Sequence, residues 1–118
     1  MRKIETQMNM AIKSQKNWSS GNTQVITVYG FARVFLHGNH IANVFDDVVN
    51  GDVKKVVQLF DGGWQTVTTK SRLNALLFEF ATGFSVFQKN WEWYISDFKN
   101  VKKEFVSNTI VNYNGCWE

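Results

Sequence analysis

The chain has 118 residues, of which 44% are hydrophobic and 19% charged, and its net charge is +3. This composition excludes a wholly disordered chain, and the length suits one small domain. The positive charge is too small and too scattered for a dedicated DNA-binding domain, which usually carries a dense run of Lys and Arg.

The first predicted element is an amphipathic helix over residues 2–15. Its apolar residues recur at i, i+4, i+7 and i+8, which places them on one helical face: Ile4, Met8, Ala11 and Ile12. The turn-forming sequence "NWSSGN" at residues 17–22 ends this helix. We expect Trp18 in that stretch to fold back on the core.

Residues 23–60 alternate apolar and polar side chains and predict a β-meander of four strands. The first two turns are expected at Tyr29-Gly30 and Gly38-Asn39, because Gly-Asn is a recognised two-residue hairpin connection. The sequence "DDVVNGD" at residues 46–52 is interpreted as a loop. The last strand of the meander is then "VKKVVQLF" at residues 53–60.

A second helix is predicted over residues 70–81. Its apolar side chains follow the i, i+3, i+4, i+7 spacing of one helical face: Leu73, Leu76, Leu77 and Phe80. Thr68 or Thr69 can cap its N-terminus by accepting a backbone N–H, and Gly83 can end it.

A β-hairpin is predicted over residues 84–96, with a tight turn at Lys89-Asn90. The variable tail at residues 97–118 is rich in Val, Ile, Thr and Tyr, which favour edge strands over a short helix. Together these elements predict a single α+β domain. Its antiparallel sheet of about six strands carries the N-terminal and central helices on one face.

Four stretches form an ordered pattern, "hGNxIA … GWxTxTTxxRLN … vfQk": "VFLHGNHIA" (34–42), "GGWQTVTTKSRLNALL" (62–77), "VFQKN" (86–90) and "WYI" (93–95). The pattern resembles that of a group of small, uncharacterised bacteriophage proteins. The chain departs from it in an insertion, "FDDVVNGDVKK", and in the tail after Asp97. The resemblance supplies no activity. It implies a phage-encoded protein that acts in the host bacterial cytoplasm.

The segment between the meander and the second helix contains most of the candidate binding residues: Trp64, Thr66, Thr68, Thr69, Lys70 and Arg72. In a purely structural interpretation, Trp64 anchors the junction, a Thr caps the helix, and Arg72 and Asn74 bond to nearby turns. In a functional interpretation, the helix N-terminus presents free N–H groups beside Lys70 and Arg72. Together these groups hold a phosphate or carboxylate. The "GNHIA" turn could then lie close to this anion site.

No catalytic group, metal site or cofactor is expected, because no catalytic or nucleotide-binding motif is present. Cys116 is the single cysteine and has no evident base partner. His37 and His40 could bind a metal only together with Asp46 or Asp47, and are more simply turn residues. With no apolar run or signal sequence, the chain is expected to be soluble and intracellular, without a membrane partner.

Three functions remain open. The first is a non-enzymatic protein that binds a host protein, as a host-takeover or anti-defence inhibitor, through exposed aromatics such as Trp91 and Trp93 or the terminal "GCWE". The second is nucleic-acid binding by a basic, aromatic sheet face that includes Arg33 or Lys89. The third is a sponge for a small anionic nucleotide signal at the second helix. A homodimer is compatible with all three.

Overall fold

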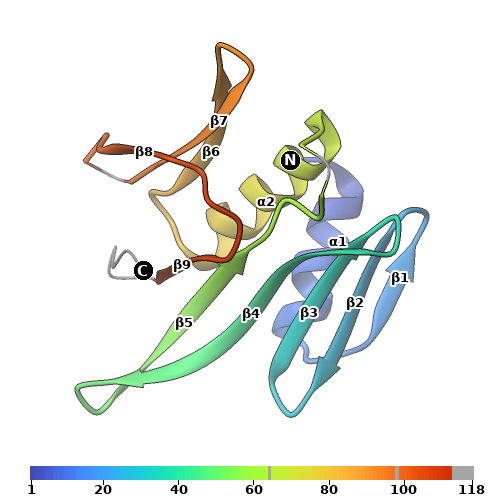
Figure 1. Ribbon diagram of the computed structural model, residues 1–118. Helices are drawn as coiled ribbons and strands as arrows, with labels where there is room; N and C mark the ends of the chain where they lie inside the picture. Colours follow the sequence, from blue (N-terminus) through green and yellow to red (C-terminus); the bar gives the residue numbers. More distant parts are fainter. Residues whose placement is uncertain (64, 98, 113–118) are drawn as a thin grey trace.

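The computed structural model describes residues 1–63, 65–97 and 99–112 (Figure 1). Two helices and nine strands follow one another along the chain: α1 (Lys3–Lys13), β1 (Trp18–Ser20), β2 (Thr23–Val28), β3 (Phe31–Leu36), β4 (Asn39–Val49), β5 (Asp52–Leu59), α2 (Val67–Phe80), β6 (Ser85–Lys89), β7 (Glu92–Ser96), β8 (Lys102–Glu104) and β9 (Thr109–Asn112). The predicted α+β class, with an N-terminal and a central helix, is confirmed.

The strands form two antiparallel sheets instead of one. The large sheet has the order β1-β2-β3-β4-β5-β9, and the small sheet has the order β6-β7-β8. The large sheet therefore has six strands, as expected, but the hairpin predicted at residues 84–96 is not among them. Its place is taken by β1 and by β9, which pairs with β5 in a register that sets Val57 beside the buried Val111.

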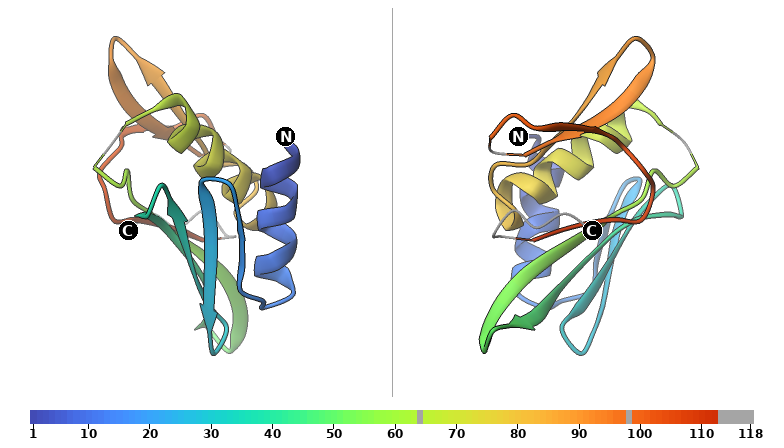
Figure 2. Two further views of the ribbon diagram at one scale, coloured as in Figure 1. Left: turned by 90° about the vertical axis from the view of Figure 1, so that its right-hand side faces the viewer. Right: turned by 60° about the vertical axis from the view of Figure 1, so that its left-hand side comes forward.

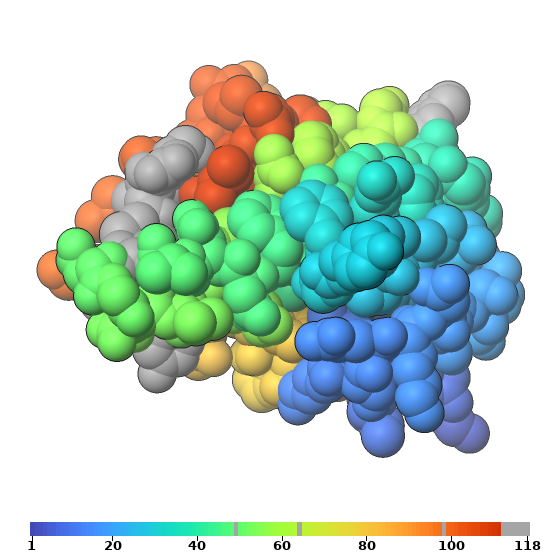
Figure 3. Space-filling model, turned by 90° about the horizontal axis from the view of Figure 1, so that it is seen from below, coloured from blue at the N-terminus to red at the C-terminus, as the bar shows by residue number. Residues whose placement is uncertain are grey.

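The stretch at residues 46–52, predicted to be a loop, is mostly strand. β4 continues to Val49 and pairs with β5 up to the Asn50-Gly51 turn, so that the hairpin extends away from α1 (Figure 3). Asp46 and Lys55 face each other across the two strands, with 2.8 Å between Oδ1 and Nζ. Such cross-strand pairs stabilise a hairpin whose local composition resembles a loop.

The second turn of the meander is centred one residue earlier than predicted. His37 and Gly38, with φ values of 51° and 78°, form the two-residue connection, and Asn39 already belongs to β4. A tight hairpin turn that matches the twist of its strands needs positive φ at both central positions, and glycine at the second adopts it without strain. The first turn, Tyr29-Gly30, lies where it was predicted.

Helix α1 matches its prediction closely, whereas α2 begins at Val67, three residues earlier than expected. The prediction that Thr68 or Thr69 caps α2 is wrong. Thr66 is the cap, because its Oγ1 accepts the backbone N–H of Thr69 at 3.1 Å. Thr69 instead lies buried in the first turn. The helix also ends earlier than Gly83, with Ala81 as its C-cap.

The main core lies between the helices and one face of the large sheet (Figure 2). Helix α1 packs on β1 and β2, and α2 packs on β4, β5 and the β6 strand of the small sheet. Trp18 packs against this core, as expected. The small sheet adds Val86, Trp93 and Ile95 to the same core, so α2 lies between the two sheets.

Candidate functional site

The junction before α2 surrounds a cavity of about 290 Å³. Its walls come from the "GNHIA" turn on one side and the helix start on the other: Leu36, His37, Asn39, Ile41, Asp61, Gly62, Thr66 and Thr69. The predicted proximity of the turn and the helix is therefore present. Neither Lys70 nor Arg72 is among the described residues that line this cavity, and its one charged side chain is Asp61.

Contacts inside this junction explain several residues of the motif as parts of the fold. The hydroxyl of Thr66 is bonded to both the backbone and the hydroxyl of Thr69. Gly62 has a φ of 68°, and a Cβ there would lie 3.1 Å from Cγ2 of Ile41 and 3.2 Å from Cβ of Asn39. Only glycine fits this position, because both the backbone angle and the close approach exclude a side chain.

Arg72 lies in a different environment from the cavity. It is only 3% exposed, and its Nη1 donates to Oε2 of Glu5 at 2.8 Å. Nε donates to Oγ1 of Thr23 at 3.0 Å, and Nη2 to Oδ1 of Asn22 at 3.3 Å. The guanidinium thus joins α1, α2 and the turn before β2. An anion is indeed bound beside Arg72, but it is a carboxylate of the same chain.

Three hydrogen-bond donors hold the Glu5 carboxylate. In addition to Arg72, its carboxylate accepts the hydroxyl of Ser71 at 2.6 Å and the backbone N–H of Arg2 at 3.1 Å. The fourth contribution is the positive charge of Arg72. Burial by itself raises the pKa of Glu5, but the hydrogen bonds from Ser71, Arg72 and Arg2 and the nearby charge outweigh it, so the pKa lies below its usual value.

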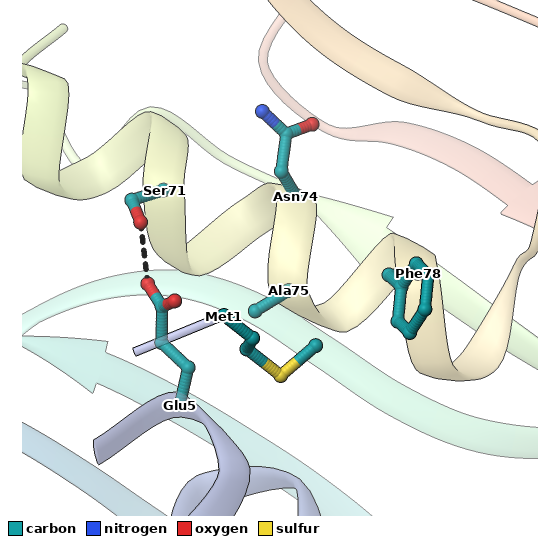
Figure 4. Close-up of a pocket in the computed structure, with 6 residues that line it drawn as sticks. All are labelled: Met1, Glu5, Ser71, Asn74, Ala75 and Phe78. Atoms are coloured by element: carbon teal, nitrogen blue, oxygen red, sulfur yellow. Dashed lines mark hydrogen bonds between the residues drawn. The ribbon is translucent and has the colours of Figure 1, made fainter. Parts of the chain in front are cut away.

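A second cavity, of about 350 Å³, lies between α1 and α2 (Figure 4). Its lining is Met1, Glu5, Ser71, Asn74, Ala75 and Phe78. The polar side chains there are already bonded within the chain. Nδ2 of Asn74 donates to the carbonyl of Val86 at 2.8 Å, and Oδ1 of Asn74 accepts the backbone N–H of Val86 at 2.7 Å. These are the two kinds of hydrogen bond that a neighbouring strand would form with Val86. What remains for a ligand is an apolar surface that includes Phe78, 68% exposed.

The two tryptophans predicted to bind a partner have opposite environments. Trp93 is 2% exposed and packs edge-to-face on Phe105, with 5.6 Å between the ring centroids. Trp91 is 91% exposed at the turn between β6 and β7. Trp93 is therefore a core residue, and Trp91 is a surface residue. Trp64 and the terminal "GCWE" lie outside the described residues.

Four of the five two-residue hairpin turns in the described chain have positive φ at both central residues, which allows a direct comparison. Three of them end in glycine: Tyr29-Gly30, His37-Gly38 and Asn50-Gly51. The fourth is Asn90-Trp91, in which Trp91 has a φ of 69°. A bulky residue in this left-handed region is a genuine outlier. Trp91 thus occupies the position that glycine takes in the other three turns.

Trp91 stands at the end of a sheet face that carries two more rings. Phe87 and Tyr94 stack across β6 and β7 with 5.6 Å between centroids, and Nζ of Lys102 lies 5.7 Å from the Phe87 centroid. The Tyr94 hydroxyl donates to Oε2 of Glu92 at 3.0 Å, and this bond and the charge of Glu92 raise the pKa of Tyr94. We name this face the hairpin surface: Phe87, Lys89, Trp91, Glu92, Tyr94, Lys102 and Glu104.

Residues 1–112 match the protein family described as Kyanoviridae Gp96 protein. The chain belongs to this family. The predicted origin as a small phage protein is thereby confirmed, and the match extends past Asp97 to include β8 and β9. No curated protein and no solved structure matches the chain.

Among the described residues, no group of three or more His, Cys, Asp and Glu side chains could hold a metal ion. In the same part of the chain, neither α1 nor α2 is long and apolar enough to cross a bilayer.

The sequence interpretation missed two features of the site. The Glu5 carboxylate was not recognised as the partner of Arg72, because 67 residues separate the two. The Phe87–Tyr94 pair was also missed, although its signal was present. Strand alternation sets Phe87 and Tyr94 on the face opposite to the buried Val86 and Trp93.

Proposed function

We propose that this phage protein acts without catalysis and binds a host protein through the hairpin surface. The observation that carries the proposal is Trp91. A left-handed backbone costs an ordinary residue about 1–2 kcal/mol, and an almost fully exposed ring recovers little of this by burial. Because the fold gains little from tryptophan here, a contact with another molecule is the better reason for it.

The surroundings of Trp91 support a protein partner. Trp and Tyr are enriched among the residues that dominate protein interfaces, usually within a polar rim. Here the rim consists of two lysines and two glutamates, Lys89, Lys102, Glu92 and Glu104, so its charges sum to zero. Such a balanced rim suits the mixed charges of a protein surface better than the uniform negative charge of a nucleic acid.

The alternative functions receive less support from the geometry. Base stacking needs free ring faces, but Phe87 and Tyr94 are stacked on each other. A sponge for an anionic nucleotide needs unpaired cations at the start of α2. The cavity there has Asp61 as its charged lining residue, and Arg72 is neutralised by Glu5.

Trp91→Gly distinguishes a role in binding from a role in folding, because it should weaken binding of the partner but increase the stability of the fold. It creates Asn-Gly, the most favourable pair for this turn, and should raise the free energy of unfolding by about 1 kcal/mol. For a chain of 118 residues this is a rise of about 4 °C in the thermal midpoint. In affinity capture from host lysate, the same variant should lose the host protein that the native chain retains in stoichiometric amount.

Tyr29→Asn is the matched control. Tyr29 is also fully exposed with positive φ, but its turn lies at the opposite end of the molecule from the β6–β7 turn (Figure 1). This variant also creates an Asn-Gly turn and should keep the partner. Equal capture by the Trp91→Gly variant would overturn the proposal. So would retention of the native chain on a DNA resin that falls steeply with salt, together with no captured protein.

A further inference from the structure

The face of the large sheet opposite the helices has no described helix against it (Figure 2). This face nevertheless carries a row of apolar side chains. Buried residues such as Val34 and Val44 face the core, so their neighbours along the strands face outward. We name this the open sheet face, and its apolar members are Ile26, Val28, Phe31, Phe35, Phe45, Val56, Phe60 and Ile110, of which Val56 is already buried. A sheet that is apolar on both faces is typical of one that is covered on both faces.

Ring contacts organise this face. Phe31 and Phe45 are nearly parallel, with 5.0 Å between centroids and 17° between planes. His40 lies between Phe35 and Phe60, at centroid distances of 5.2 Å and 4.8 Å. Because Phe31 and Phe45 stack on each other, each covers one face of the other ring. This arrangement favours apolar packing over base stacking.

The polar side chains between the rings are already bonded to one another. Nε2 of His40 lies 2.6 Å from Oδ1 of Asn43, whose Nδ2 donates to Oε1 of Gln58 at 3.0 Å. Gln58 in turn donates to Oδ1 of Asn108. Covering these groups is therefore less costly than covering unpaired amides, because each keeps a partner when water is removed.

We propose that a second copy of this chain covers the open sheet face. The argument is charge complementarity. Arg33 is exposed two residues beyond Phe31 on β3, and Asp47 is exposed two residues beyond Phe45 on β4. Since β3 and β4 are antiparallel, the two charges lie on opposite sides of the Phe31–Phe45 pair. A two-fold axis through this pair sets Arg33 of each copy against Asp47 of the other.

The size of the face sets the strength of this dimer. The four central strands β2–β5 span about 19 Å across and about 20 Å along, which gives a footprint of about 400 Å² per copy. That is about half of a standard interface, so the dimer is weak and depends on concentration. The hairpin surface lies on the other sheet and stays free, so each dimer presents two such surfaces.

Sedimentation velocity of the full chain from about 5 to about 500 μM tests the proposal, with charge-reversal variants. Arg33→Glu and Asp47→Lys should each weaken the dimer by about tenfold or more, because like charges then meet twice across the axis. The double variant exchanges the two signs and should restore the native dimer. Lys16→Glu, an equal charge change on an exposed residue after α1, should leave it unchanged.

Several outcomes would overturn this proposal. One is a native chain that stays monomeric over the whole range of concentrations. Another is a double variant as weak as the single ones, which would show that Arg33 and Asp47 do not meet. A third is single-stranded DNA binding that Arg33→Glu abolishes, which would assign the face to nucleic acid. Trp91→Gly should leave dimerisation unchanged, so this result is independent of the proposed host-protein contact.

Discussion

Replacement of Glu5 by Gln tests whether the buried ion pair with Arg72 holds the two helices together. Both side chains are almost completely buried, at 3% and 4% exposed, and Nη1 and Oε2 lie 2.8 Å apart. Removing one partner of a buried pair leaves an uncompensated charge and costs about 3–5 kcal/mol. A glutamine oxygen can still accept from Ser71 and Arg72, so we expect the lower end, about 3 kcal/mol at pH 7.

The assay is urea or thermal unfolding followed by circular dichroism. With an unfolding entropy of about 2.1 cal/mol/K for each of 118 residues, a loss of 3 kcal/mol lowers the midpoint by about 12 °C. Glu79→Gln is the matched control. It makes the same chemical change in the more exposed Lys13–Glu79 pair, whose side chains are 54% and 32% exposed and which also joins α1 to α2 at 2.8 Å. This control should cost less than about 1 kcal/mol.

The pH dependence gives a second test of Glu5. Its pKa in the folded protein lies below its usual value, so its ionisation stabilises the fold fully above the unfolded pKa of about 4.3. That contribution is lost as the pH falls through the folded pKa. The difference between the native chain and Glu5→Gln should therefore shrink in acid. A difference below 1 kcal/mol at pH 7, or one that does not change on acidification, would refute the reasoning.

Two further predictions concern single hydrogen-bonding side chains. Thr66→Ala removes the hydroxyl that accepts the backbone N–H of Thr69 at the start of α2. Urea titrations should show a free energy of unfolding lower by about 1 kcal/mol, whereas Thr66→Ser should retain most of the native stability. Asn74→Ala leaves the N–H and C=O of Val86 without their side-chain partner. It should lower the free energy of unfolding by about 2 kcal/mol and speed hydrogen exchange at the Val86 amide. Unchanged exchange at Val86 would show that Asn74 does not protect the β6 edge.

Elements governed by local periodicity were predictable from the sequence. The apolar stripes of both helices and the alternation in β2 and β3 are properties of neighbouring residues, and the structure has those elements. The distal part of β4 was misread because Asp, Asn and Gly favour loops. The pairing of this part of β4 with β5, which includes the ion pair between Asp46 and Lys55, stabilises it as a strand. The division into two sheets depends on β9 pairing with β5, and no local pattern encodes that choice.

Only part of the candidate site could be predicted from the sequence, for the same reason. Residue type alone predicts the same role for Trp91 and Trp93. The positions at which β6 ends and β7 begins place Trp91 in a turn and Trp93 in the core. A cation near the start of a helix also suggested a ligand for Arg72. Its actual partner, Glu5, is distant in sequence and becomes adjacent only when α1 packs on α2.

The pairing of β9 with β5 also bears on how the chain is synthesised. About fifty residues separate the two strands, so β5 leaves the ribosome long before its neighbour exists. During that interval the nascent chain carries an unprotected β-edge beside Val57 and Leu59, which is a template for pairing with other chains. Rapid translation of the segment from α2 to β9 should shorten this exposure and raise the yield of native protein in an infected cell.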